Sequence, residues 1–308
     1  MKALVTGGAG FIGSHVVRLL SRRGHEVIVL DNLSTGCEEN LKPFPRITFL
    51  RGDIGNLNLL KEAMAGCDTV FHLAASISNV KSIEFPHLDA EVNIMGTLNV
   101  LEAMKSCHVK TIVFSSSAGI FGEPRYQPID EEHPCHPDSP YGVGKWAAEK
   151  HILCLSKIRS FRAVCLRYFN AFGVNQRYDA YGNVIPLFVA RILKGEPISI
   201  YGDGEQTRDF IHVSDLASAN LKVAEQNDVQ GLFNLGSGQA VTINKLVAIL
   251  KEIMPEKITA LHTAPRPGDV RHSLADINRA KKVFGFAPQI DLGEGLRNYV
   301  DWFRTLPA

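Results

Sequence analysis

The chain has 308 residues, of which 45% are hydrophobic and 21% are charged, and its formal net charge is +1. This length allows one large domain or two ordinary ones, and the composition is that of a globular protein. The balanced charge argues against nucleic acid or a membrane surface as a partner, and no apolar run approaches the length that spans a bilayer.

Six cysteines lie at positions 37, 67, 107, 135, 154 and 165, with no C-x-x-C pair and no histidines at metal-site spacing. This pattern is typical of reduced thiols in the cytoplasm, and we expect no metal. The N-terminus runs at once into a strand and a glycine-rich turn, so it does not have the form of a signal peptide. We therefore expect a cytoplasmic protein.

The first 170 residues alternate short apolar runs with longer helical patterns. The apolar runs predict strands at residues 2–5, 26–30, 47–50, 69–73, 111–114 and 162–166. The helical patterns between them predict helices at residues 11–23, 57–65, 88–105 and 141–155. This alternation predicts an α/β fold with a doubly wound parallel (Rossmann) sheet, which binds its ligand beyond the carboxyl ends of the strands.

The pattern changes after about residue 170, where helices and strands become mixed. Helices are predicted at residues 184–193, 244–254 and 292–304, and strands at 198–201 and 232–235. We predict a first domain over residues 1–170, joined by some later segments, and a smaller mixed α/β domain over residues 171–308.

The segment VTGGAGFIG closes the first strand and opens the first helix. Gly8, Gly10 and Gly13 satisfy G-x-G-x-x-G, and Gly7 gives a wider version of the same spacing. Such glycines allow a sharp turn and let the backbone approach a pyrophosphate at the helix N-terminus. The motif alone is also compatible with a plain turn, but its position between a strand and a helix favours dinucleotide binding.

Two acidic residues follow the next strands. Asp31 ends the second strand, where its carboxylate would accept hydrogen bonds from the adenosine ribose and repel a 2′-phosphate, so NAD is favoured over NADP. Its alternative role is that of an ordinary acid in a turn. Asp53, at the end of the third strand, could receive the adenine amine, although an Asp before a helix is also a common N-cap.

The stretch SPYGVGKWAAEK places Tyr141 four residues before Lys145, on one face of a predicted helix. A nearby ammonium and the positive nicotinamide ring would favour the phenolate of Tyr141, which could then act as a base. An exposed surface pair is the alternative. The catalytic interpretation is favoured by Ser115, Ser116 and Ser117 at the end of the fifth strand, because one serine there could relay a substrate proton. The other two would form a polar turn.

Together these motifs resemble the extended short-chain dehydrogenases/reductases. The stretches LRYFNAFG, IYGDGEQTRDFIHVSDLA and RPGDVRHSLADI are similar to the nucleotide-sugar epimerase branch, above all to UDP-glucose/UDP-galactose and UDP-N-acetylglucosamine 4-epimerases. The resemblance runs from Met1 to the last helix. It implies NAD-dependent epimerisation of a UDP-hexose through a transient 4-keto sugar, with residues 1–170 binding NAD and residues 171–308 the nucleotide-sugar. It also implies a homodimer that packs through the helices at 88–105 and 141–155.

The resemblance further implies roles for single residues, with Tyr141 as the base, Lys145 as its tuner and Ser117 at the sugar 4-hydroxyl. Besides Tyr141 and Lys145, the implied NAD contacts are Gly7, Gly10, Phe11, Ile12, Gly13, Asp31, Asn32, Ser34, Gly36, Asp53, Ile54, Leu73, Ala74, Ala75, Asn93, Ser115 and Tyr168. Besides Ser117 and Tyr141, the implied substrate contacts are Phe169, Asn170, Asn183, Val184, Tyr201, Arg208, Arg266, Asp269 and Ser273.

Ser273 bears on which sugar is accepted. In the epimerases that the chain resembles, a tyrosine at this position restricts the enzyme to glucose and galactose, whereas a small residue leaves room for a 2-acetamido group. The resemblance therefore implies that UDP-GlcNAc and UDP-GalNAc are also accepted. The alternative is that Ser273 only caps the following helix.

Three other functions stay open. A UDP-glucuronate 4-epimerase would use the same catalytic groups. A dehydratase or decarboxylase of the same family places acids directly after the strand-end serine, where this chain has Ala118 and Gly119. A non-catalytic NAD(H)-binding sensor or scaffold belongs to a different class, and such proteins typically lose the tyrosine or the lysine that this chain retains.

Overall fold

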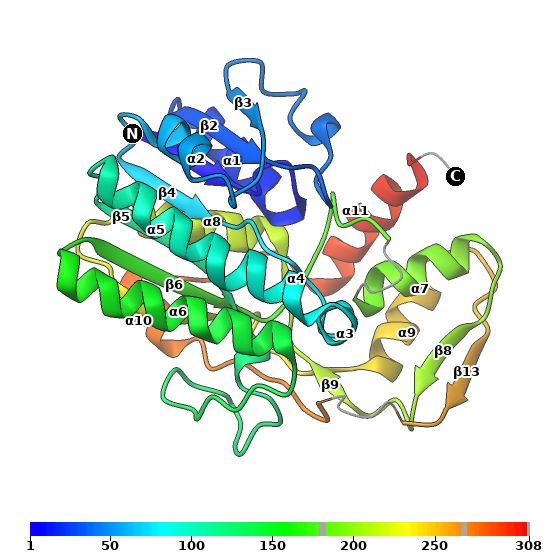
Figure 1. The fold of residues 1–308 in the computed structure, drawn as a ribbon. Helices are drawn as coiled ribbons and strands as arrows, with labels where there is room; N and C mark the ends of the chain where they lie inside the picture. The colour runs from blue at the N-terminus through cyan, green and yellow to red at the C-terminus, as the bar shows by residue number, and fades with distance from the viewer. Residues whose placement is uncertain (179–182, 266–269, 307–308) are drawn as a thin grey trace.

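The computed structural model describes residues 1–178, 183–265 and 270–306, and a parallel seven-stranded sheet forms its centre (Figure 1). The strand order is β11-β6-β5-β4-β1-β2-β3, and every pair in it is parallel. The strands are β1 (Lys2–Thr6), β2 (Glu26–Asp31), β3 (Thr48–Arg51), β4 (Thr69–His72), β5 (Thr111–Ser117), β6 (Arg162–Tyr168) and β11 (Gly231–Leu235). The predicted doubly wound α/β sheet is confirmed.

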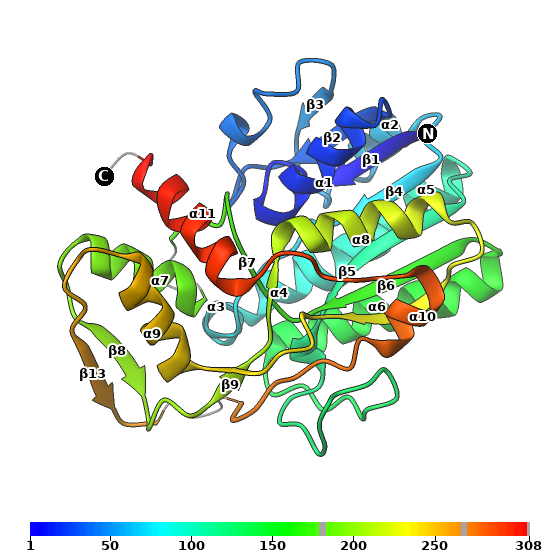
Figure 2. The same cartoon turned by 180° about the vertical axis from the view of Figure 1, so that it is seen from behind.

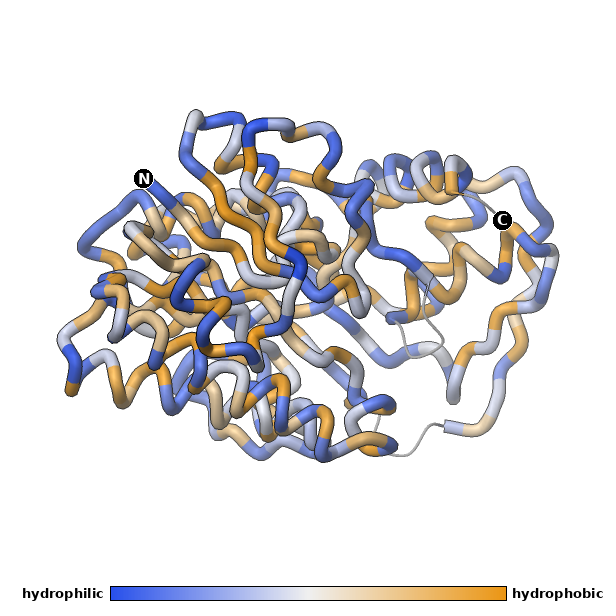
Figure 3. Tube along the Cα trace, turned by 45° about the horizontal axis from the view of Figure 1, so that its top comes forward, coloured by the Kyte–Doolittle hydropathy of each residue, from blue (hydrophilic) through white to orange (hydrophobic). Residues whose placement is uncertain are grey.

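Helices cover both faces of the sheet because successive strand side chains point to opposite sides. In β1, Ala3 and Val5 pack into one core cluster, whereas Leu4 packs into another. The first face carries α1 (Phe11–Arg22), α8 (Val213–Glu225) and α10 (Asn278–Phe284) (Figure 2). The opposite face carries α2 (Leu57–Met64), α5 (Thr97–Ser106) and α6 (Pro140–Arg159). Figure 3 shows the hydrophobic stretches running along the strands between these helices.

The helix predicted over residues 88–105 is interrupted. It consists of α4 (Pro86–Ala90), a π-helical turn (Glu91–Gly96) and α5, and it is preceded by the short helix α3 (Asn79–Glu84). A side chain at Gly96 would collide with Ile54, so the glycine lets the π turn lie against its neighbour. Because π turns often occur at functional sites, the residues of this turn are of interest below.

The second half forms its own core around α7 (Val184–Leu193), α9 (Ile243–Ile253) and α11 (Leu292–Arg304). Three two-stranded sheets surround this core, two of them parallel and one antiparallel. Their strands are β7 (Asn170–Phe172) with β10 (Phe210–His212), β9 (Thr207–Arg208) with β12 (Val241–Thr242), and β8 (Ile198–Tyr201) with β13 (Ala260–Thr263). Two single 3₁₀ turns occur at Glu38–Asn40 and Ala118–Ile120.

Two segments from beyond residue 170 pack on the central sheet. The strand expected at residues 232–235 of the mixed half is β11, which pairs with β6 at the edge of the central sheet. Helix α8, which the sequence pattern did not predict, packs against α1 on that sheet. No helix among the described residues is both long and apolar enough to cross a bilayer.

Candidate active site

The carboxyl ends of the parallel strands bring the predicted cofactor residues to one edge of the sheet. The glycine turn follows β1, Asp31 ends β2, and Leu73 follows β4. The serines form the end of β5, and Tyr168 ends β6. Segments that are far apart in the sequence therefore meet at the edge where this fold binds its ligand.

The glycine turn forms a cradle that side chains would fill. Gly7 has φ +70°, and a Cβ there would lie 2.7 Å from the backbone nitrogen of Ala74. A Cβ at Gly13 would collide with the carbonyl of Gly7. Gly10 is the N-cap of α1, and among the described residues no side chain caps this helix. The first-turn N–H groups of α1 are therefore available to an anion such as a pyrophosphate.

The Asp31 carboxylate is tied to the same turn. It accepts hydrogen bonds from the backbone N–H of Ala9 (2.9 Å) and of Leu33 (2.8 Å). Burial raises the pKa of Asp31, and these backbone hydrogen bonds oppose that rise. A Cβ at Gly36 would lie 2.8 Å from Oδ1 of Asp31, so glycine keeps this space open. A buried carboxylate beside a glycine cradle fits the ribose and pyrophosphate of NAD.

Asp53 lies beyond the third strand rather than at its end, because β3 ends at Arg51. Its Oδ2 accepts from Asn32 Nδ2 at 2.6 Å, and its Oδ1 accepts from Gly55 N at 2.7 Å. The N-cap of α2 is Asn56, so Asp53 does not serve as a helix cap. The pair of Asn32 and Asp53 thus stands next to Asp31, where an adenosine would lie.

Tyr141 is placed by the start of α6. Ser139 is the N-cap and accepts from Gly142 N at 3.2 Å, and Pro140 is the first helical residue, so Tyr141 lies in the first turn. The side chains of Tyr141 and Ser117 lie close together, since a Cβ at Gly119 would touch both of them. Burial raises the pKa of Tyr141 above its usual value, the interaction with the Ser117 side chain lowers it, and the charge of Asp89 raises it further.

The three serines have separate partners. Two of them were expected to form a polar turn, but all three lie in β5. Ser115, Ser116 and Ser117 are the last residues of β5 and pair in register with β6. The Ser117 hydroxyl also accepts from the N–H of Gly119 at 3.0 Å, so the capping role and the contact with Tyr141 fall on the same serine. Its hydroxyl is therefore held in place from two sides.

Lys145 lies in the interior one turn of α6 after Tyr141, with 2% of its surface exposed. Its ammonium donates to the carbonyl of Ser115 at 2.9 Å and lies 5.0 Å from the ring centre of Phe114. Burial lowers the pKa of Lys145 to about 8, and the charge of Asp89 opposes this. The ammonium therefore sits near its own titration point at mildly alkaline pH.

His72 is the nearest imidazole to this lysine and is completely buried. Burial, with the Lys145 charge added, lowers the pKa of His72 to about 3. Its ring nitrogens hydrogen-bond the hydroxyls of Thr6 (2.8 Å) and Thr97 (3.0 Å). His72 is thus a neutral residue that joins β1 to α5, as expected from a histidine with a structural role.

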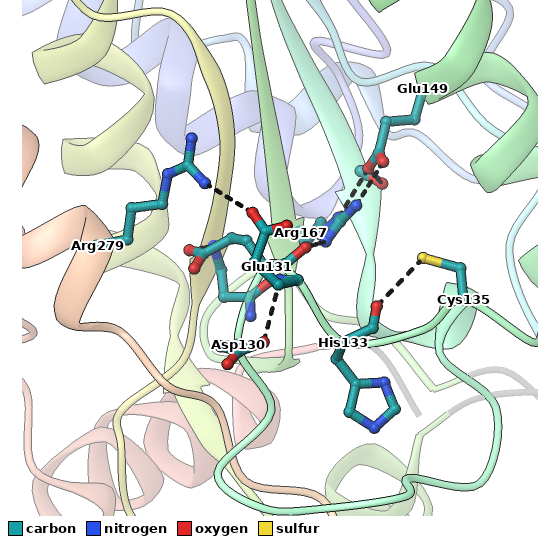
Figure 4. Close-up of polar contacts among 10 residues, drawn as sticks. Asp130, Glu131, His133, Cys135, Glu149, Arg167 and Arg279 are labelled. Carbon is teal, nitrogen blue, oxygen red and sulfur yellow. Dashed lines mark hydrogen bonds and ion pairs between the residues drawn. The ribbon is translucent and has the colours of Figure 1, made fainter.

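A buried ion pair lies one helical turn beyond Lys145. Glu149 of α6 is 0% exposed and Arg167 of β6 is 2% exposed, and two hydrogen bonds of 2.7 and 3.0 Å join them. Ser116 donates to the same carboxylate at 2.8 Å, and Arg167 also donates to the carbonyl of Glu131 at 3.1 Å (Figure 4). The network fixes α6 against the ends of β5 and β6, and it was not predicted from the sequence.

The predicted substrate residues of the described chain come from several elements. The ring centres of Phe169 and Phe121 are 6.4 Å apart. Asn170 begins β7, and its side-chain amide donates to the carbonyl of Asp209 at 3.4 Å. Tyr168, which was predicted as an NAD contact, accepts from Asn220 of α8 through its hydroxyl at 2.6 Å. The others are Asn183 and Val184 at the start of α7, Tyr201 at the end of β8 and Arg208 in β9. Arg266 and Asp269 lie outside the described residues.

Ser273 is 8% exposed and lies in a segment held at both ends. The carbonyl of Arg271 accepts from Thr207 N at 3.0 Å, and the carbonyl of Leu274 accepts from Ile129 N at 2.8 Å. The next helix begins at Asn278, four residues later than a serine cap would require. The interpretation of Ser273 as a helix cap is therefore wrong.

The described residues form no metal centre, and the two residues that follow β5, Ala118 and Gly119, are not acidic. In the described parts of the chain, no group of three or more His, Cys, Asp or Glu side chains could hold a metal ion. A Cβ built on Gly119 would lie 3.3 Å from Ser117 Oγ and 3.6 Å from the Tyr141 ring. Gly119 thus lies next to Ser117 and Tyr141 but brings no acidic side chain to them.

Comparison with known proteins agrees with this geometry. Residues 3–236 match the model of the NAD dependent epimerase/dehydratase family. The chain is similar to the structure of a UDP-glucose 4-epimerase with UDP-glucose from Thermotoga maritima, at 39% identity over 99% of each chain and a TM-score of 0.94.

Two further solved structures have comparable likeness. One is a UDP-N-acetylglucosamine 4-epimerase from Methanobrevibacter ruminantium in complex with UDP-N-acetylmuramic acid, with 39% identity over 99% of this chain and 98% of the other, and a TM-score of 0.94. The other is a UDP-glucose 4-epimerase from Thermus thermophilus in complex with NAD, with 36% identity over 99% of each chain and a TM-score of 0.90.

Proposed function

Since the chain belongs to the NAD-dependent epimerase/dehydratase family, we propose that this enzyme, which uses NAD, interconverts UDP-hexoses that differ in configuration at C4. The observation that carries the proposal is that Ser117, Tyr141 and a buried Lys145 lie together at the edge of the sheet where the glycine turn and Asp31 also lie. The 4-epimerases at 36–39% identity support the choice of reaction.

Each residue of this site has a task in the reaction. The glycine turn and Asp31 would hold NAD, which when bound would supply the hydride chemistry at C4. Tyr141 takes the 4-hydroxyl proton, directly or through Ser117, and gives it back when the 4-keto sugar has turned over. Lys145 provides positive charge that favours the phenolate. Residues of the second half hold the nucleotide while the sugar turns.

The proposal is tested by incubating the purified protein with UDP-glucose, UDP-GlcNAc and UDP-glucuronate, each without added cofactor, followed by analysis of the sugars. We expect UDP-galactose from the first and UDP-GalNAc from the second, because the cofactor is regenerated in each turnover. Conversion of UDP-glucuronate alone would make the chain a glucuronate epimerase instead. The absence of any C4 inversion in a protein that retains NAD would favour a sensor or scaffold.

Ser273 determines which hexoses enter. We propose that this small buried side chain leaves room for a 2-acetamido group, so Ser273→Tyr should lower kcat/KM for UDP-GlcNAc by overpacking, roughly 5- to 150-fold if the cost is the 1–3 kcal/mol typical of such changes. UDP-glucose should be turned over nearly as before. The matched control is Ser273→Ala, which should spare both substrates. Equal slowing of both substrates by Ser273→Tyr would show that Ser273 does not line the sugar pocket.

We also propose a homodimer through α4, the π turn and the start of α6. Exposed apolar side chains gather on these elements, on α3 and on the residues that flank α3, and they are Ile77, Ile83, Phe85, Leu88, Met95 and Val143. Such a patch on one surface is typical of a protein interface, and a second copy of the chain would bury it symmetrically.

The dimer prediction is tested by light scattering at micromolar concentration. The wild type should have twice the mass of the chain, and Leu88→Glu with Met95→Glu should yield the monomer, because charges would be buried in the interface. Leu261→Glu on β13, an equally exposed apolar position away from α6 in Figure 1, should leave the dimer intact. A wild-type monomer would refute the proposal.

A further inference from the structure

Asp89 is a buried carboxylate next to the catalytic helix, and the reaction described above does not use it. It lies on α4 and is 1% exposed. Its Oδ1 accepts from the side-chain amide of Asn93 in the π turn at 2.9 Å, and the same amide donates to the carbonyl of Ser76 at 2.9 Å. The π turn therefore aims an amide donor at this carboxylate and holds it in the interior.

A glycine brings the carboxylate against α6. A Cβ at Gly144 would lie 2.9 Å from Oδ2 of Asp89 and 3.2 Å from Cβ of Asn93. Gly144 precedes Lys145 directly and follows Tyr141 by three residues. The absence of a side chain at this one position thus lets a carboxylate of α4 approach the turn of α6 that carries both catalytic residues.

Asp89 and Lys145 carry opposite charges, and within the described ranges neither takes part in an ion pair. In that part of the chain, Asp89 accepts only from the neutral amide of Asn93, and the hydrogen bonds of the Lys145 ammonium are limited to the carbonyl of Ser115. An ammonium buried without a countercharge is costly and tends to lose its proton. Asp89 is the acid that acts electrostatically on Lys145 and on Tyr141, and it favours the protonated form of both.

We propose that Asp89 is a positioning residue that acts through Lys145 and Tyr141, and that its negative charge sets the pH range in which this pair works. The proposal rests on the epimerase function proposed above and deepens it. Asp89 keeps the ammonium charged at mildly alkaline pH. By the same field it holds the phenol protonated until the positive cofactor ring and the substrate are present.

The other charged groups around the site do not set the pKa of Lys145 and Tyr141. The Glu149 carboxylate is neutralised by Arg167, and His72 behind Lys145 is neutral, since its pKa is about 3. Asp138 lines the same surface hollow as Asp89, between α4 and α6, and accepts from Glu123 N at 3.0 Å. It is the charge of Asp89, and not that of Asp138, that raises the pKa of Lys145 and of Tyr141.

The test is the pH dependence of kcat for Asp89→Asn, which keeps an acceptor for Asn93 and removes the charge. Both limbs of the profile should move to lower pH by about one unit, because loss of a nearby negative charge lowers the pKa of the ammonium and of the phenol together. At alkaline pH, kcat should therefore fall, whereas KM for the UDP-sugar should change little. Asp89→Ser, a second neutral variant, should give the same displacement.

Asp138→Asn is the matched control, since it removes an acid from the same hollow, and its pH profile should coincide with that of the wild type. A folded Asp89→Asn whose profile also coincides with the wild type, or moves to higher pH, would overturn the proposal. A loss of activity at every pH without displacement of the limbs would assign Asp89 a purely structural role and would overturn it equally.

A second measurement does not depend on epimerase activity. In protein freed of nucleotide, the absorbance change of tyrosine ionisation is titrated with and without Tyr141→Phe, and the difference belongs to Tyr141 alone among the seven tyrosines. Asp89→Asn should lower the midpoint of this difference titration. If the wild type has no epimerase activity but the midpoint falls, the proposed function fails and the role of Asp89 stands. An unchanged midpoint removes that role.

Discussion

Replacing Tyr141 by phenylalanine should lower the turnover of a UDP-hexose by about two to four powers of ten, the effect of losing a positioned general base. The change deletes a single oxygen. The ring stays in the first turn of α6, and the ammonium of Lys145 keeps its hydrogen bond to Ser115, because neither depends on the phenol hydroxyl. We therefore expect bound NAD and the KM for substrate to be nearly unchanged, as single-turnover and steady-state kinetics would show.

Tyr299→Phe is the matched control for this experiment. Tyr299 is fully buried, and its hydroxyl donates to the carbonyl of Gln176 at 2.7 Å, far along the chain from the site. Its loss should cost about 1 kcal/mol of unfolding free energy, as for one hydrogen bond, and leave kcat unchanged. Turnover of Tyr141→Phe within threefold of the wild type would mean that another group takes the proton.

The second large effect is expected at the buried ion pair. Glu149→Gln should lower the free energy of unfolding by about 3–5 kcal/mol, because it leaves the Arg167 guanidinium buried without its countercharge. The double variant Glu149→Met with Arg167→Met should recover most of this loss, since two apolar side chains of similar volume need no partner. Urea denaturation of the three proteins measures both differences.

An exposed ion pair that is also joined by two hydrogen bonds serves as the control. Arg271 and Asp203 are joined by two hydrogen bonds of 2.7 Å, but their side chains are about half exposed. Asp203→Asn should change stability far less than Glu149→Gln does, because water screens the pair in the wild type and solvates the arginine in the variant. If both substitutions cost the same, burial is not the cause of the Glu149 effect.

The features predicted from sequence depend on neighbouring residues. The glycine turn, the acid at the end of β2 and the Tyr141–Lys145 spacing are short patterns, and the strand–helix alternation fixes a parallel sheet that gathers them at one edge. Boundaries were less well predicted. The strand β5 extends through its serines because they pair with β6, and a cross-strand partner is not visible in a local pattern.

The features missed from sequence depend on distant residues. Ser116 and Glu149 are 33 residues apart, and Arg167 lies a further 18 residues along the chain from Glu149. A charged residue within the apolar strand β6, together with a glutamate four positions after Lys145, was the available signal. Asp89 had no such signal, since an acid on a helix is usually solvated and its burial follows from Gly144 and the π turn.

Because β11 pairs with β6, the chain cannot be cut near residue 170 into two parts that fold separately. A fragment that stopped there would leave β6 as an open edge with unpaired backbone groups, and it would uncover the side of α1 on which α8 packs. The polypeptide crosses from the central sheet to the core of the second half, returns through α8 and β11, leaves for α9, and returns once more as α10 before it ends in α11. Both halves should therefore melt in one transition, and loss of order in the second half should reach the glycine turn after β1 through covalent connection as well as through contact.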